Sequence, residues 1–275
     1  MAQTKKQIVE ILESIGGSPR HRFGQNFMID QNMVRSVVDA GEIAEGDRVI
    51  EIGPGTGTLT EEILSRGARV IAVEIDRDLA AMLRERFAGN EKFQLIEGDA
   101  LAGKHHLNPE LLAVLPTAKL VANLPYNIAS PLVIEMLIAG VELLAFTVQR
   151  EVADRLRAKA GEEAYGPLTA MVQMLGEVEV LKVLPPQVFW PQPKIESALV
   201  RIRRADRMGN RANDFTVFVH KLFSARRKTL RKAMTNAGIE AEKVLGAAGI
   251  DGQLRPEVLT PEELYRLFDL SEASE

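Results

Sequence analysis

The 275-residue sequence contains no cysteine. Disulfides, zinc–thiolate sites, iron–sulfur clusters and thiol nucleophiles are therefore excluded, and the composition fits a reducing compartment. The four histidines lack metal-ligand spacing, so we expect no metal site. The longest uncharged stretch, residues 120–134, contains two prolines and is too short to cross a bilayer. Acids interrupt the apolar run of the N-terminal segment, unlike a signal peptide, and we predict a cytoplasmic protein.

Charge is unevenly distributed along the chain. The formal net charge of −4 argues against a uniformly basic nucleic-acid-binding protein. Residues 201–232, however, contain eleven Lys and Arg residues against two acids, and a second basic cluster lies at residues 20–22. A run of like charge is usually a solvated face, so these clusters indicate polyanion binding only if they flank a site that needs it.

Short β-branched runs alternate with helical patterns before residue 205. This alternation predicts an α/β fold with a mostly parallel sheet covered on both faces. The expected strands are residues 48–52, 69–74, 93–96, 119–122 and 143–148, and two later runs, 178–183 and 198–202, can form an antiparallel pair at the sheet edge. Helices are expected at residues 59–64 and 76–87.

The sequence changes in character after residue 204. Residues 205–213 are polar and contain glycine, as a linker would. Only helical patterns follow, at residues 215–223, 226–237, 241–248 and 261–268. We therefore predict two domains, residues 1–208 and a small all-helical domain, residues 209–275.

Candidate ligand-binding residues lie where the expected strands end. In an open parallel sheet, ligands bind beyond the carboxyl ends of the strands. The first strand leads into the turn EIGPGTG at residues 51–57, the second ends at Glu74, and the third precedes Asp99. Glycines let a backbone approach a ligand closely. The Glu74 carboxylate can accept both hydroxyl hydrogens of a ribose, and Asp99 can accept from an adenine amino group.

Two adenosine-containing cofactors suit this layout. A dinucleotide-binding turn has the spacing G-x-G-x-x-G, whereas the third glycine here comes one position early. Glu51 would be unfavourable beside a pyrophosphate and favourable beside a cationic sulfonium or amino group. The spacing E-x-G-x-G-x-G resembles the first motif of class I methyltransferases and favours S-adenosylmethionine over NAD.

The tetrapeptide Asn123-Leu124-Pro125-Tyr126 follows the fourth expected strand. Residues of this kind would suit methylation of N6 of adenine. This amine is a poor nucleophile because its lone pair is delocalised into the ring. The Asn123 side-chain oxygen and a nearby main-chain carbonyl can accept the hydrogens of the amine, while Pro125 keeps the segment extended. Tyr126 can stack on an extruded base. A simple strand-to-turn break is the alternative, but the place of the turn in this layout favours catalysis by orientation and electrostatics.

A series of ordered motifs resembles one family, the ribosomal RNA adenine dimethyltransferases, and specifically the small-subunit (16S) enzymes. The motifs are FGQNFM at 23–28, EIGPGTGTLT at 51–60, Glu74, GDA at 98–100, NLPYNI at 123–128, QREV at 149–152, AYG at 164–166, VFxPxPKIxSA at 188–198 and FxxRRKxL at 223–230. The resemblance covers residues 19–268. Met28 departs from it, since the family usually has leucine there, but a main-chain contact would survive that change.

The resemblance implies a class I methyltransferase (Rossmann-like) fold, with a mostly parallel seven-stranded sheet and an antiparallel edge strand. Residues 1–208 would be the catalytic domain that binds S-adenosylmethionine, with no metal. Its cofactor-binding residues would be Asn26, Met28, Glu51, Gly53, Gly55, Gly57, Glu74, Asp99, Ala100 and Asn123. Its catalytic residues would be Asn123, Leu124, Pro125, Tyr126 and Phe189. The Asn123 side chain and the Leu124 carbonyl would hydrogen-bond to the target amine, and Tyr126 and Phe189 would pack on the base.

The implied reaction is dimethylation of N6 on two adjacent adenosines in the 3′-terminal hairpin of small-subunit rRNA, within an immature small ribosomal subunit. Residues 209–275 would bind the RNA. Phosphate contacts are expected from Arg20, Arg22, Arg226, Arg227, Lys228 and Arg231. We expect a monomer that does not bind membranes.

Three alternatives remain open at the level of the sequence. The first is the large-subunit rRNA methyltransferase that confers macrolide resistance. The second is a non-catalytic ribosome-assembly factor on the same scaffold, which would be expected to lose Asn123 or Tyr126, although both are present. The third is an NAD-dependent oxidoreductase, which leaves the Asn123–Tyr126 turn unexplained.

Overall fold

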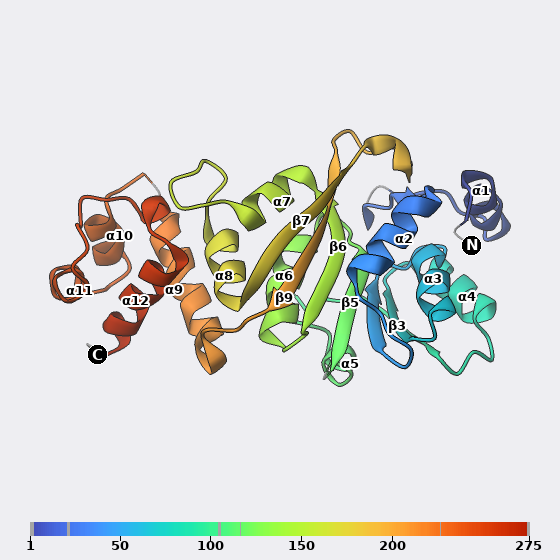
Figure 1. Cartoon of the computed structure of the whole chain (residues 1–275), viewed down its shortest axis with the longest axis horizontal. Coiled ribbons are helices and arrows are strands. Elements are labelled where there is room, and N and C mark those ends of the chain that lie inside the picture. Colours follow the sequence, from blue (N-terminus) through green and yellow to red (C-terminus); the bar gives the residue numbers. More distant parts are fainter. Residues whose placement is uncertain (1–2, 21–22, 104–105, 116, 226, 274–275) are drawn as a thin grey trace. The chain divides into compact units, whose positions relative to one another are not determined.

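The structure is a computed structural model that describes residues 3–20, 23–103, 106–115, 117–225 and 227–273 (Figure 1). The chain divides into two compact units. The first comprises Met1–Ala153 and Glu179–Arg204, and the second comprises Asp154–Val178 and Ala205–Glu275. Within the described ranges, no helix has the length and apolar character needed to cross a membrane.

The second unit is larger than the helical domain expected at residues 209–275, because it also contains residues 154–178. The reason is the packing of α8 (Pro167–Leu175), which lies against α9 (Ala212–Ser224) and α12 (Pro261–Glu272). An all-helical C-terminal segment therefore needs a helix from the middle of the sequence to complete its core. The RNA-binding role predicted for this unit remains a proposal.

A seven-stranded sheet in the order β4-β3-β2-β5-β6-β9-β7 organises the first unit. Its strands are β2 (Arg48–Ile52), β3 (Arg69–Glu74), β4 (Phe93–Glu97), β5 (Ala118–Asn123), β6 (Leu143–Gln149), β7 (Gly176–Leu184) and β9 (Ser197–Arg204). Strands β4, β3, β2, β5 and β6 pair in parallel, and β9 is antiparallel to β6. The expected mostly parallel sheet with an antiparallel strand is therefore confirmed.

The antiparallel strand β9 is not the edge strand, which corrects one detail of the expected sheet. β9 lies between β6 and β7, and β7 forms the edge. The burial of side chains explains this order. The first four residues of β9 are all buried, as in a strand with neighbours on both sides, whereas most of β7 is exposed.

The strand order places a crevice at the ends of β2 and β5. The chain runs outward from β2 to β3 and β4 and then returns to β5, so the direction of winding changes between these two neighbours. The carboxyl ends of strands at such a point bind ligands in open α/β sheets. Pairing between β2 and β5 stops at Ile50 and Leu120, before either strand ends, which leaves the following turns free to part.

The first unit also contains a set of helices. They are α1 (Lys5–Ser14), α2 (Gln31–Ala40), α3 (Thr58–Ser65), α4 (Arg77–Arg86), α5 (Pro109–Leu112), α6 (Ala129–Ile138) and the start of α7 (Arg150–Arg157). The Asp30 side chain caps α2 by accepting from the amides of Asn32 and Met33. The buried face of α2 then packs with Val121 and Ala145 of the sheet in one apolar cluster.

A two-stranded sheet joins distant parts of the first unit. In it, β1 (Phe27–Met28) pairs antiparallel with β8 (Phe189–Trp190), so that Phe27 faces Trp190 and Met28 faces Phe189. Ile8 of α1 packs in the same apolar cluster as Phe27. The segment of residues 27–28 is therefore held both by pairing with β8 and by packing against α1.

The second unit is helical and has an aromatic core. Besides α8, α9 and α12 it contains α10 (Leu230–Asn236) and α11 (Ala241–Ala248), which are coloured brown to red in Figure 1. The rings of Phe215 and Phe268 lie 5.6 Å apart. The helix expected from residue 226 begins four residues later, because Thr229 adopts an extended N-cap conformation. The Lys228 amide donates to the Ala225 carbonyl at 2.7 Å, closing the turn between α9 and α10.

Candidate active site

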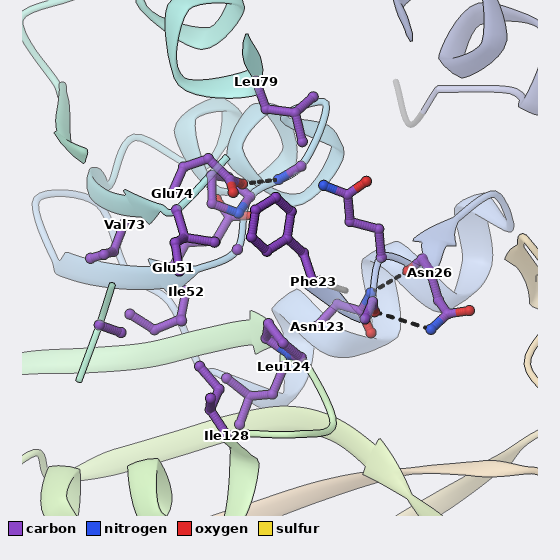
Figure 2. A pocket seen from close by; sticks show the side chains of 18 of the residues that line it. Phe23, Asn26, Glu51, Ile52, Val73, Glu74, Leu79, Asn123, Leu124 and Ile128 are labelled. Carbon is purple, nitrogen blue, oxygen red and sulfur yellow. Dashed lines mark hydrogen bonds between the residues drawn. The ribbon is translucent and has the colours of Figure 1, made fainter. Parts of the chain in front are cut away.

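A pocket opens in the first unit where β2, β3, β4 and β5 end (Figure 2). Four sequence-distant turns and the loop of residues 23–28 line it. The predicted site residues that line it are Asn26, Met28, Glu51, Gly53, Gly55, Glu74, Asp99, Ala100, Asn123, Leu124, Pro125 and Tyr126. The fold therefore brings most of the predicted cofactor-binding and catalytic residues to one cavity.

Two buried carboxyl groups lie in one wall of the pocket. Glu51 is 1% exposed and accepts a hydrogen bond from the Thr60 hydroxyl at 2.6 Å. Burial raises its pKa to about 8, and the nearby charge of Glu74 adds to the effect. Burial likewise raises the pKa of Glu74 to about 7, although Glu74 accepts from the amides of Gly55 at 3.2 Å and Asp76 at 2.9 Å. A cation or hydroxyl donor in the pocket would stabilise the ionised form of both groups.

The glycine-rich turn is tightly enclosed by the other turns of the site. Gly53 and Gly55 have φ of 68° and 59°, and a Cβ on Gly55 would come within 2.9 Å of the Phe27 ring. Gly57 is not among the residues that line the pocket, and its place in the cofactor site stays a prediction. It is the N-cap of α3 with φ 85°, and a Cβ there would meet the Phe87 ring at 3.0 Å. Gly57 thus allows close helix packing.

The pocket offers polar atoms that suit a nucleoside-containing cofactor. The hydroxyls of Thr56 and Thr58 are buried, belong to lining residues and have no hydrogen-bond partner among the described residues. A buried hydroxyl without a partner is costly, so both are ready to bond a polar ligand. One oxygen of Asp99 accepts from the Leu101 amide at 3.0 Å, which leaves the other available. These donors and acceptors fit S-adenosylmethionine.

The side chain of Asn123 is held by two bonds, and Figure 2 shows the one to Asn26. Its Nδ2 donates to the main-chain carbonyl of Asn26 at 2.7 Å, and its Oδ1 accepts from the Thr147 hydroxyl at 2.5 Å. The hydroxyl of Tyr126 lies 2.7 Å from that of Ser197. Burial raises the pKa of Tyr126, so this phenol stays neutral. Thr147 and Ser197 were not predicted. The signal for Thr147 is a single hydroxyl in the otherwise apolar run LLAFTV, and Ser197 lies in the motif at 188–198.

The loop of residues 23–28 is anchored to the start of α4 by Asp76. Gln25 donates to the Asp76 carboxylate at 2.9 Å, and Arg20 forms ion pairs with Asp76 at 2.5 Å and with Asp78. Arg20, predicted to contact RNA, is thus bonded to two carboxylates in this structure. Arg22 lies outside the described residues. Asp76 was not predicted, since an acid at a helix start is expected simply to cap it, which Asp76 also does.

Phe189 is not among the residues that line the pocket. It is 2% exposed and packs in the same apolar cluster as Met28, its partner in the β1–β8 pair. This arrangement offers no exposed ring face for a base. Stacking by Phe189 stays a prediction, and Tyr126 is the pocket-lining aromatic of the predicted pair.

The sequence model of the family described as ribosomal RNA adenine dimethylase matches residues 17–272. The chain belongs to this family. A protein of Moorella thermoacetica named ribosomal RNA small subunit methyltransferase A is 38% identical over 94% of this chain and 95% of its own. A protein of the same name from Magnetococcus marinus is 40% identical over 94% and 93%. The predicted family and enzyme class, an rRNA adenine dimethyltransferase, are confirmed.

Solved structures agree with this assignment. A dimethyladenosine transferase from Plasmodium falciparum superposes with a TM-score of 0.71 at 23% identity, covering 88% of this chain and 95% of that one. The 23S rRNA methyltransferase ErmE superposes with a TM-score of 0.64 at 27% identity, covering 90% and 100%. The class I methyltransferase fold is confirmed, and fold and family imply S-adenosylmethionine as the methyl donor. Among the described residues, no cluster of His or acidic side chains could hold a metal ion.

The basic residues predicted for the second unit of this dimethylase have different surroundings. Arg227 and Lys228 are exposed in the turn between α9 and α10, and Arg231 on α10 pairs with Glu242 at 3.1 Å. Arg226 lies outside the described residues. Arg227 and Lys228 are the better candidates for phosphate contacts, because Arg231 already has an acidic partner.

Proposed function

We propose that this dimethylase transfers methyl groups from S-adenosylmethionine to N6 of two adjacent adenosines in the 3′-terminal hairpin of small-subunit rRNA, within an immature small subunit. The observation that carries the proposal is the Asn123 amide, which lines the same pocket as Glu51, Glu74 and Asp99 and is held by two hydrogen bonds. The names of the relatives at 38% and 40% identity support the small-subunit substrate.

The cofactor would lie along the strand ends. Glu74 would hold the ribose hydroxyls, Asp99 and Ala100 the adenine, and Asn26 with the main chain of Met28 the methionine end. The ionised form of Glu51 would face a positive group, since burial leaves this carboxylate short of partners. When bound, S-adenosylmethionine supplies a methyl group on a positively charged sulfur, and transfer to N6 leaves a neutral thioether and releases one proton.

The residues of the turn at 123–126 would activate the amine without a strong base. Asn123 Oδ1 and the Leu124 carbonyl would accept its hydrogens, which favours a tetrahedral nitrogen with a localised lone pair. Tyr126, with its hydroxyl bonded to Ser197, would present its ring to the extruded base, and such stacking contributes about 1–3 kcal/mol. Because the proton leaves after transfer, catalysis rests on orientation and electrostatics.

The second unit would bind the RNA backbone. Arg227 and Lys228 are exposed in a segment where basic residues predominate, and contacts of this kind give salt-dependent, sequence-independent affinity. Selection of two adenosines then requires recognition of RNA shape as well. We also propose a cytoplasmic location, because the curated relatives are bacterial proteins named for ribosomal RNA, and we propose that the protein acts as a monomer.

Methylation of defined substrates tests the proposal. The purified protein and labelled S-adenosylmethionine are incubated with immature small subunits that lack the modification, and the nucleosides are then analysed. We expect label in dimethyladenosine, whereas label confined to large-subunit RNA would identify the resistance-type activity. Binding to the subunit without any label would identify the assembly factor.

The catalytic assignment is tested by replacing Asn123 with alanine. This change should abolish turnover while leaving the dissociation constant of the cofactor within a few-fold, because the amide acts on the target amine. Replacing Asn32, an exposed asparagine on α2, with alanine should preserve turnover. Normal methylation by the Asn123 variant would refute the assignment.

A further inference from the structure

Thr147 is a buried polar residue on a central strand. Its side chain is fully buried, and it is the hydroxyl-bearing residue in the otherwise apolar start of β6. A hydroxyl in such surroundings is costly unless it is hydrogen-bonded. Its bond is to Asn123, which lies directly opposite it in the parallel β5–β6 register. The hydroxyl therefore holds the Asn123 side chain at the end of β5.

The chemistry of the neighbours fixes which way the Asn123 amide points. The main-chain carbonyl of Asn26 can only accept, so the atom facing it at 2.7 Å must be the Nδ2 donor. The Oδ1 atom then faces the Thr147 hydroxyl, which donates to it. An amide oxygen has two lone-pair sites. Thr147 occupies one of them, which leaves the other for a hydrogen of a target amine.

We propose that Thr147 is a positioning residue that keeps Asn123 Oδ1 turned toward the target amine through both methyl transfers. This inference rests on the proposed function. Without the hydroxyl, the Asn26 carbonyl alone would restrain the amide, and Asn26 belongs to a loop. The restraint matters more in the second transfer, because the monomethylated amine has one N–H left to bond and a methyl group in place of the other.

A threonine-to-valine change tests this role, because it removes the hydroxyl and keeps the branched shape. In single-turnover reactions with immature small subunits, Thr147→Val should lower the rate constant on the order of tenfold, the effect expected for one lost orienting hydrogen bond. The share of monomethyladenosine among the products should rise. The cofactor dissociation constant should stay within about twofold, since Thr147 does not line the pocket.

Two comparisons separate positioning from a general loss of stability. Thr147→Ser keeps the hydroxyl and should restore the rate and the product ratio. The Thr147→Ala variant differs from the serine variant by one oxygen atom. If the valine variant does not fold, comparison of the serine and alanine variants tests the role of the hydroxyl. Thr169 is equally buried and donates to the Arg155 carbonyl at 2.6 Å. Thr169→Val should therefore cost similar stability and leave the product ratio unchanged.

The outcomes distinguish this inference from the proposed function. A wild-type protein that does not methylate small subunits would overturn the proposed function. A wild-type protein that does methylate them, alongside Thr147→Val or Thr147→Ala variants with unchanged rate constants and product ratios, would overturn the role of Thr147 alone.

Discussion

Replacing Glu51 with glutamine should stabilise the cofactor-free protein at neutral pH. Burial raises the pKa of Glu51 from an ordinary 4.5 to about 8, so the folded protein keeps a proton on this carboxyl that the unfolded chain releases. The stability linked to this raised pKa is complete below pH 4.5 and is lost as the pH rises toward 8. Since pH 7 lies about 2.5 pH units above 4.5, the loss at ~1.4 kcal/mol per unit is about 3 kcal/mol.

The glutamine variant isolates the effect of Glu51 ionisation on stability, because it keeps the size of the side chain and an oxygen that can accept from Thr60. Its free energy of unfolding should match that of the wild type near pH 4.5 and exceed it by about 3 kcal/mol at pH 7. Urea unfolding at a series of pH values measures the difference. Glu85, an exposed acid on α4, gives the control variant Glu85→Gln, which should follow the wild type.

The same substitution should weaken cofactor binding. A bound cation favours the ionised carboxylate, which glutamine cannot provide, so affinity should fall by about tenfold or more, as for a hydrogen bond to a charged group. The rise in wild-type affinity between pH 6 and pH 9 should become smaller in the variant, because the contribution of Glu51 is lost while that of Glu74 remains. A stability difference that does not change with pH would refute the claim that Glu51 is neutral in the cofactor-free protein.

Three further changes test other parts of the structure. Asp76→Asn should weaken cofactor binding, measured by equilibrium titration, because it loosens the loop of residues 23–28; unchanged affinity would show that the anchor is dispensable. Gly55→Ala should lower both affinity and melting temperature, because its Cβ would lie 2.9 Å from the Phe27 ring at a φ of 59°; wild-type behaviour would contradict the close contact. Replacing Arg227 and Lys228 with glutamine should reduce the salt dependence of subunit binding by about one unit of slope per lost phosphate contact. An unchanged slope would indicate that this turn is an ordinary solvated surface without phosphate contacts.

The central strands could be located from the sequence with good accuracy. Residues 48–52 and 69–74 form strands with the expected bounds, because strands inside a parallel sheet are buried on both faces and appear as continuous apolar runs. The acids and the asparagine at the strand ends could also be assigned to one pocket. The order of strands in an open parallel sheet brings these ends together.

Contacts across the sheet and between short segments could not be predicted. The bond between Thr147 and Asn123 depends on strand register, which neither local sequence contains. The two-residue strands β1 and β8 have no periodicity to detect, and their pairing buries Phe189. The start of α10 was misplaced because Arg and Lys favour helices, while Thr229 sets the actual start.

The helical unit is assembled from two separate stretches of the chain, Asp154–Val178 and Ala205–Glu275. Cutting the gene after residue 208 would therefore leave α8 attached to the remainder without α9 and α12, exposing to water buried side chains such as Met171, which Thr216 of α9 contacts at 3.5 Å. During synthesis the same helix emerges first and must wait for α9 and α12. Folding of this unit can therefore be completed only after α12 has been synthesised.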